Sequence, residues 1–258
     1  AELTASFLLK SGILKDGVRM QAGAGGISLA IAVFVHHILK EKGWKSSFGF
    51  GGSTQYMVKM LEEGQMGHIL DAQAFDLDAV ASIERNPCHV PYSVFNAYNY
   101  HSKGNLTSMM DIMILGATEI DTEFNGNVVT HSDGCLLHGI GGWQNCLHAR
   151  NVIIPVPLFR DRIPVIVDSV TTLCGPGEMI DVIITERGIA INPLRQDLID
   201  SVKDSGLPLK TITELREEAE KICGKPQKPQ FEEDVVAAVK WVDGTVIDVV
   251  RKLRDEKI

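Results

Sequence analysis

Four residues near the middle of this sequence form the segment best suited to chemistry. Residues 139–142 read Gly-Ile-Gly-Gly and lie in a stretch rich in turn-forming residues between two apolar segments. Glycines at this density allow the backbone to turn tightly and leave its N–H groups accessible. Such a loop can hold an oxyanion or a thioester carbonyl. Taken alone, these four residues are equally consistent with an ordinary glycine-rich turn.

Two further glycine turns come early in the chain, each between a predicted strand and a predicted helix. The first, residues 21–26, leads into a helix over residues 27–39, on which we expect His36 to face solvent. The second follows a strand over residues 47–50 and leads into a helix over residues 55–63. Such junctions collect N–H groups and the positive end of the helix dipole, so they favour anions. The glycine spacing is not the dinucleotide fingerprint, and no nicotinamide site is predicted.

Composition excludes several classes of function. The 258 residues are 45% apolar and 22% charged, which is typical of a globular protein, and the net charge of −8 comes without any lysine and arginine run. Nucleic acid and an anionic membrane surface are therefore not predicted as partners. No apolar run is long enough to cross a bilayer, and we expect a cytoplasmic protein. Five scattered cysteines without a C-x-x-C pair, and histidines without ligand spacing, predict no metal site.

The remaining segments predict an α/β protein with a mostly parallel sheet flanked by helices. Short β-branched runs separated by turns predict further strands at residues 68–71, 111–116, 127–130, 151–155, 163–167, 181–185 and 188–191. Helical spacing covers residues 3–14, 77–85, 196–206 and 211–223. We assign residues 1–223 to one domain and residues 224–258 to a C-terminal appendage. The appendage is predicted to contain a linker, a strand over residues 235–242 and a helix capped by Thr245.

Ten collinear segments resemble one known family. They are QAGAGGISLAIAVF, FGFGGSTQYMVKMLEEG, DAQAFDLDAV, NPCHV, ILGATEIDTEFNGNV, SDG, GIGG, RDRIPVIVD, DVIITERGIAINPLR and DGTVIDVVRKL. In order and spacing they resemble the C-terminal half of the citrate lyase alpha subunit, a citrate CoA-transferase. The resemblance covers essentially the whole chain and implies an acyl-CoA transferase domain of the NagB/RpiA/CoA transferase-like type. The family's subunit has two similar α/β domains, and this chain resembles the second.

The resemblance also implies a reaction and its partners. Citrate would exchange with acetate on a thioester carried by CoA or by the phosphopantetheine-type arm of an acyl carrier subunit, as in citrate fermentation, and the step needs no metal. The acyl carrier subunit and a lyase beta subunit would be partners in an oligomer. Superfamily relatives place a nucleophilic glutamate on the turn that here reads Gly51 to Gln55, which contains none. Its absence favours direct attack by a citrate carboxylate over a covalent enzyme intermediate.

Site residues carried over from the family fall into three groups. The loop near the thioester carbonyl and the turn that replaces the glutamate supply the candidate catalytic residues Gly139, Gly141, Gly142, Ser53 and Thr54. The candidate cofactor-binding residues lie in the two early turns and an Ser-Asp-Gly element and are Gly23, Gly25, Gly26, Gly51, Gly52, Ser132, Asp133 and Gly134. Guanidinium groups bind carboxylates in a bidentate fork, and side-chain amides can donate hydrogen bonds to carboxylates. The candidate substrate-binding residues are therefore Arg160, Arg162, Arg187, Asn99 and Asn127, with Arg195 as a further arginine.

One segment departs from the family. Where its members commonly have His-x-Asp directly after the glycine loop, this chain has Trp143, Gln144 and Asn145. The change removes a titratable pair and leaves two alternatives open. In the first, the protein is a transferase for citrate or for a related acid such as citramalate. In the second, it is a binding or assembly module, or a degenerate transferase, and holds the acyl carrier and lyase subunits.

Overall fold

The computed structural model describes residues 1–21, 23–101 and 105–254. Within them, the central element is a sheet of eight strands in the order β13-β12-β8-β5-β1-β2-β3-β4. Its strands are β1 (Arg19–Gln21), β2 (Phe48–Ser53), β3 (Ile69–Ala74), β4 (His89–Pro91), β5 (Ile112–Ile114), β8 (Val152–Pro155), β12 (Val182–Thr185) and β13 (Gly188–Ile191). All neighbours are parallel except β12 and β13. The predicted fold class, a mostly parallel sheet flanked by helices, is confirmed.

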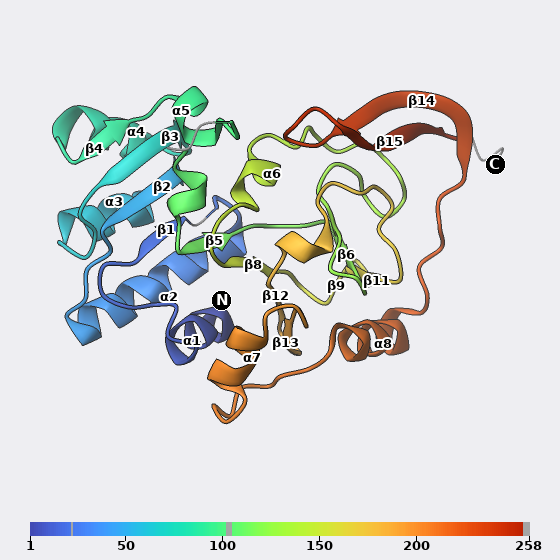
Figure 1. Ribbon diagram of the computed structural model, residues 1–258, viewed down its shortest axis with the longest axis horizontal. Coiled ribbons are helices and arrows are strands. Elements are labelled where there is room, and N and C mark those ends of the chain that lie inside the picture. Colours follow the sequence, from blue (N-terminus) through green and yellow to red (C-terminus); the bar gives the residue numbers. More distant parts are fainter. Residues whose placement is uncertain (22, 102–104, 255–258) are drawn as a thin grey trace.

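Helices cover the sheet and connect its strands. They are α1 (Glu2–Lys10), α2 (Gly26–Lys42), α3 (Gln55–Glu62), α4 (Leu77–Arg85), α5 (Val94–Tyr98), α6 (Trp143–Cys146), α7 (Gln196–Val202) and α8 (Ile212–Cys223). Figure 1 shows α2 and α3 beside strands β1 to β3, and α8 on the opposite side of the molecule. No helix in the described part of the chain is long and apolar enough to cross a membrane.

The core lies on both faces of the sheet because alternate strand residues point to opposite sides. Ile112 and Ile114 of β5 pack with helices α1 to α3, whereas Met113 between them packs with the long segment that follows β5. The same alternation holds along β8 and β12. Burial on both faces explains why these strands read as continuous apolar runs.

The segment between β5 and β12 folds over one face of the sheet mostly as loops. Its short strands are β6 (Glu119–Asp121), β7 (Gly126–Asn127), β9 (Phe159–Arg160), β10 (Ile163–Pro164) and β11 (Ile166–Val167). The predicted strand at residues 163–167 is in fact β10 and β11, which belong to two different small sheets. Of the predicted strand at residues 127–130, Asn127 alone is in a strand. Thr130 forms only an isolated antiparallel bridge with Leu136, and its hydroxyl forms a hydrogen bond with that of Thr172.

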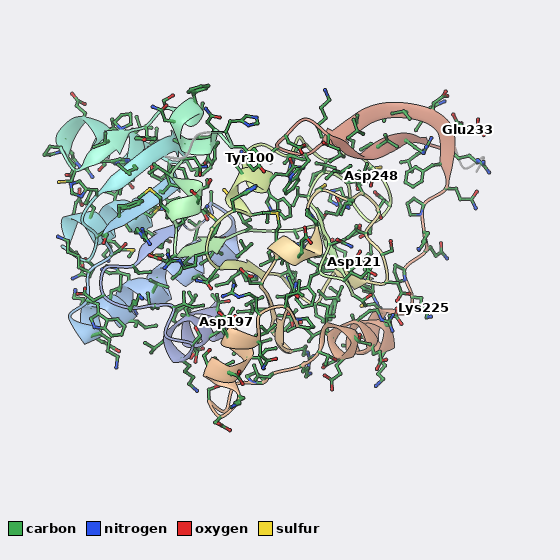
Figure 2. All side chains as sticks on the ribbon, in the orientation of Figure 1. Tyr100, Asp121, Asp197, Lys225, Glu233 and Asp248 are labelled. Atoms are coloured by element: carbon green, nitrogen blue, oxygen red, sulfur yellow. The ribbon has the colours of Figure 1, made fainter. Side chains whose placement is uncertain are left out.

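The C-terminal part differs from its prediction. The predicted helix after Thr245 is strand β15 (Val246–Leu253), which pairs antiparallel with β14 (Phe231–Lys240). The hairpin curves along the upper right edge in Figure 1. It packs onto the body of the protein through buried Val239 and Val250, and Asp248 accepts a hydrogen bond from the Leu173 amide at 2.6 Å (Figure 2). The division at residue 223 stays a prediction.

His36 on α2 also differs from its prediction. Its ring is 7% exposed and lies 3.0 Å from the side-chain oxygen of Gln65 and 3.4 Å from a carboxylate oxygen of Glu63. These partners satisfy the imidazole, which is why a polar residue can occupy the packed face of the helix. The buried face of α2 therefore includes His36 together with Ala32, Val35 and Leu39.

Candidate functional site

The glycine turns meet where the direction of winding of the sheet reverses. From β1 the chain proceeds outward through β2, β3 and β4, then returns to place β5 on the other side of β1. In open parallel sheets the carboxyl ends of the strands on either side of such a point form a crevice. Gly23 and Gly25 follow β1 here, with Gly25 as the N-cap of α2. Gly51 and Gly52 lie within β2, which runs to Ser53, so the turn predicted directly after residue 50 is strand instead. Gly51 has a φ of +97°, a conformation that favours glycine.

A cavity of about 550 Å³ occupies this crevice, and we call it the neutral cavity. None of its lining residues that the structure describes carries a charge. Its polar groups come from amides, a phenol and glycine backbone, and the residues that matter below are Gln21, Gly23, Gly52, Gln73, Tyr98, Gly141, Gly142, Trp143, Asn145 and Cys146. Neutral donors beside apolar surface suit an uncharged ligand with carbonyl groups, such as an amide or a thioester.

A second cavity of about 500 Å³ has the opposite character, and we call it the basic cavity. His131, His138 and Arg160 line it together with Thr118 and apolar side chains. Arg160 is exposed as a whole residue, but its Nη2 donates to the Ala117 carbonyl at 2.9 Å. Partial desolvation of the guanidinium lowers its pKa without removing its charge. A cation with two imidazoles favours an anionic ligand.

Trp143 separates the two cavities, because it lines both. Its ring is held tightly: a Cβ at Gly126 or Gly175 would lie 2.7 Å or 2.5 Å from the nearest ring atom. Its indole N–H donates to the Gly116 carbonyl at 2.8 Å. Trp143 is thus a packed wall between a neutral space and a basic one.

The predicted glycine loop lies along the same wall. Gly141, with a φ of +59°, and Gly142 line the neutral cavity, while Ile140 lines the basic cavity. The Gly139 carbonyl lies 2.7 Å from His138 Nδ1. The loop therefore contacts both spaces.

Three predicted catalytic residues line neither cavity, namely Gly139, Ser53 and Thr54. Ser53 is fully buried, and its hydroxyl donates to Asp71 Oδ2 at 2.8 Å. The same oxygen lies 3.2 Å from Nε2 of buried His89. Thr54 is the N-cap residue of α3 without a side-chain cap bond, and Asp76 instead accepts from the Gln55 amide at 2.7 Å.

The Asp71 network supports the floor of the neutral cavity. Asp71 Oδ1 accepts from the Gln73 amide at 2.8 Å, beside an irregularity in the pairing of β2 with β3 between Gly51 and Gly52. The extra residue on β3 turns Ala72 and Gln73 toward the cavity, as β-bulges near binding sites commonly do. The hydrogen bonds of Ser53 and Asp71 therefore stabilise the part of β3 that lines the neutral cavity.

The Ser-Asp-Gly element is divided between a cavity and the hairpin. Ser132 and Asp133 line a smaller cavity of about 220 Å³ that shares His131 and Arg160 with the basic cavity. Gly134 faces the hairpin instead, because a Cβ there would lie 2.8 Å from Leu253 and 2.9 Å from Phe231.

Of the predicted substrate-binding residues, Arg160 lies in the basic cavity and the others do not line either main cavity. Arg162 is exposed in the turn between β9 and β10, and Arg187 lies in the turn after β12, 3.9 Å from Glu218. Asn127 is buried and donates to Glu119 at 2.8 Å. The remaining two have structural partners of their own, since Asn99 accepts from the His101 amide and Arg195 pairs with Asp181 and Asp197.

Sequence reasoning did not single out Gln21, Gln73 or Tyr98, all of which line the neutral cavity. Gln21 and Gln73 are polar residues at the carboxyl ends of parallel strands, and that position is a signal available from the sequence. Tyr98 ends α5 in a loop whose position depends on contacts with distant residues, so no local pattern indicates it.

Comparison with known proteins decides the family. The family model for citrate lyase, alpha subunit, matches residues 1–253. The chain belongs to the citrate lyase alpha-subunit family. Citrate lyase alpha chains from Klebsiella pneumoniae and Escherichia coli K12 are 42% and 40% identical over 256 residues, which is 99% of this chain and 50% of each relative. The chain thus spans about half the length of the citrate lyase alpha chains that it matches.

Solved structures agree. A citrate lyase alpha subunit from Streptococcus mutans, determined in complex with citrate, is 41% identical and superimposes with a TM-score of 0.96 over 98% of this chain and 50% of that one. The alpha subunit of a malonate decarboxylase from Acinetobacter baumannii has a TM-score of 0.59 over 88% of this chain and 56% of that one. At 14% identity, this second likeness concerns the fold alone. The predicted resemblance to citrate lyase alpha subunits is confirmed.

Proposed function

We propose that this chain forms part of a citrate:thioester transferase that exchanges acetyl for citryl on CoA or on the phosphopantetheine-type arm of an acyl carrier subunit. The observation that carries the proposal is the pairing of a neutral cavity with a basic one across Trp143 and the glycine loop. A thioester arm is uncharged near its reactive carbonyl, and citrate is a tricarboxylate. The two ligands therefore suit the two cavities. The citrate bound by the Streptococcus mutans relative supports the choice of acid.

The geometry favours direct transfer. A carboxylate held near Arg160 attacks the thioester carbonyl at the glycine loop, so that a C–O bond forms and the C–S bond breaks. The released thiolate then attacks the citryl carbonyl of the mixed anhydride, and acetate leaves. Charge is conserved in both steps, and neither consumes a proton. Among the residues that line the neutral cavity there is no carboxylate that could carry the acyl group itself.

Two members of the glycine loop, Gly141 and Gly142, would stabilise the tetrahedral intermediates. Both line the neutral cavity, where backbone N–H groups can approach a carbonyl oxygen without obstruction by side chains. An acyl carrier subunit and a lyase beta subunit are the partners that this reaction implies.

Acyl exchange tests the proposal. The full-length natural polypeptide that carries this sequence is mixed with acetyl-CoA and either citrate or citramalate, and new acyl-CoA is identified by mass. We expect Arg160→Gln to raise the KM for the acid about 10- to 100-fold, which corresponds to the loss of one or two charge-assisted hydrogen bonds. Arg162→Gln, in the exposed turn next to it, is the matched control and leaves KM within about threefold.

Either of two results would contradict this proposal. If neither acid yields a new acyl-CoA, the chain is a binding or assembly module instead of a transferase. If Arg160→Gln and Arg162→Gln behave alike while exchange proceeds, the acid does not occupy the basic cavity.

A further inference from the structure

Tyr98 is held in a fixed position beside Gly51 of β2 and Gly142 of the glycine loop. It is the last residue of α5, and the side-chain amide of Asn145 donates to its carbonyl at 2.7 Å. Its ring lies 5.6 Å from the ring of Phe50, between centroids, at an angle of 54°. Contacts from β2 and α6 therefore fix the direction of the phenol, although α5 itself is only five residues long.

The phenol lies between Gly51 of β2 and the glycine loop. Its hydroxyl oxygen would be 3.8 Å from a Cβ at Gly51, and its ring carbons would be 3.2 Å from a Cβ at Gly142. The tyrosine also lines the neutral cavity. Its hydroxyl has no recorded hydrogen-bond partner within the described part of the chain. A donor of this kind in a cavity is available to a ligand.

The surroundings keep the phenol protonated. Burial, followed by the nearby Cys146 and Asp71, raises the pKa of Tyr98 well above its usual value. The same burial raises the pKa of the Cys146 thiol to about 12, so neither group supplies a negative charge to the cavity at neutral pH. At neutral pH the protonated hydroxyl is therefore a hydrogen-bond donor, and Tyr98 is not a general base.

We propose that the Tyr98 hydroxyl donates a hydrogen bond to the thioester carbonyl oxygen and stabilises the negative charge that forms on it during transfer. This inference rests on the proposed function and adds a side-chain donor to the backbone donors of the glycine loop. When the carboxylate oxygen bonds to the carbonyl carbon, the π electrons move to the carbonyl oxygen; when the C–S bond breaks, they return. Tyr98 keeps its proton throughout and is a catalytic residue by electrostatic stabilisation alone.

Tyr98→Phe tests the inference, because it removes the hydroxyl and retains the ring that packs on Phe50. In the full-length polypeptide we expect kcat for acyl exchange to fall about 100-fold or more, as for the loss of one oxyanion donor, with the KM for citrate within about threefold of the unchanged protein. Tyr100→Phe, two residues further on and exposed, is the matched control and should retain full activity.

A thioether analogue separates the carbonyl contact from the packing of the ring. Ethyl-CoA lacks the carbonyl oxygen, so its inhibition constant should be the same for the unchanged protein and for Tyr98→Phe. Equal thermal unfolding of the two proteins would show that the ring still packs.

The outcomes are distinguishable. Exchange by the unchanged protein, with Tyr98→Phe within threefold in kcat, overturns the role of Tyr98 and leaves the transferase standing. Weaker binding of ethyl-CoA to Tyr98→Phe, together with an unchanged kcat, shows a packing role only. Absence of exchange in the unchanged protein overturns the proposed function, and the role of Tyr98 fails with it.

Discussion

Replacing Trp143 gives the most direct test of the wall between the two cavities. The indole is 9% exposed, and its outer ring atoms are those that lie against Gly126 and Gly175. Phenylalanine at this position has two ring carbons fewer and lacks the N–H that donates to the Gly116 carbonyl. The side chain would no longer fill the space between the two glycines.

The magnitude follows from these two losses. Each buried carbon contributes about 0.8 kcal/mol, and the loss of the hydrogen bond to a carbonyl beside a cavity costs about 1 kcal/mol. Trp143→Phe should therefore lower the free energy of unfolding by about 2–3 kcal/mol. Trp143→Ala, which leaves a larger void, should cost about 3–5 kcal/mol.

Urea unfolding followed by far-UV circular dichroism measures both variants without relying on tryptophan fluorescence. A loss of about 2–3 kcal/mol corresponds to a melting temperature lower by about 4–12 °C in a protein of this size. Trp44→Phe is the matched control. Trp44 is half-buried, and the structure records no hydrogen bond for its indole N–H within the described residues, so its replacement should cost less than about 1 kcal/mol.

The packing argument would be refuted by a Trp143→Phe variant within about 0.5 kcal/mol of the unchanged protein. It would also be refuted if Trp44→Phe cost as much as Trp143→Phe, because the loss would then not depend on the contacts with Gly126, Gly175 and Gly116.

Two further predictions concern stability. Burial tends to raise the pKa of Asp111, but hydrogen bonds from Arg19, the shortest at 2.7 Å, hold that pKa below its usual value. The ionised carboxylate therefore stabilises the fold above about pH 4. This contribution is lost as the pH falls through the lowered pKa. Asp111→Asn should therefore cost about 2 kcal/mol at pH 7 and almost nothing near pH 2 in urea titrations, and a pH-independent loss would contradict the ion pair. A Cβ at Gly177 would lie 1.8 Å from the backbone oxygen of Glu123, so Gly177→Ala should lower the free energy of unfolding by about 1–3 kcal/mol. Gly139 has open space around it, so the control Gly139→Ala should change the free energy of unfolding by less than about 0.5 kcal/mol. Equal melting temperatures for the two variants would contradict this account.

The sequence by itself indicated the family and most strands of the sheet, although edge strand β4 and the order of the strands were not predicted. Short β-branched runs and the helical spacing over residues 77–85 depend on local preferences and on burial by any partner, so they could be read without knowing the partner. The glycine turn after β1 is equally local, because a tight turn between a strand and a helix limits the residues that fit. The glycines after residue 50 do not form the predicted turn, because pairing with β3 keeps them in strand β2.

The predicted strand over residues 235–242 overlaps β14, but the tertiary structure alone decided that the segment after the next turn is strand β15. Val246, Val249, Val250 and Leu253 have the spacing of a helix face, and the same segment is also rich in residues that favour strands. Pairing with β14, burial of Val250 and the bond from the Leu173 amide to Asp248 select the strand. These contacts join residues far apart in sequence, which no local pattern encodes.

The two cavities are also a product of tertiary structure. Gln21, Tyr98 and Trp143 come from separate parts of the chain and meet because β1 and β5 are neighbours in the sheet. The sequence could identify Arg160 as one of several candidate cations, but only the packing of the loops after β5 separates it from Arg162 and Arg187. Residue types specify which chemistry is available; the winding of the sheet decides which residues share a cavity.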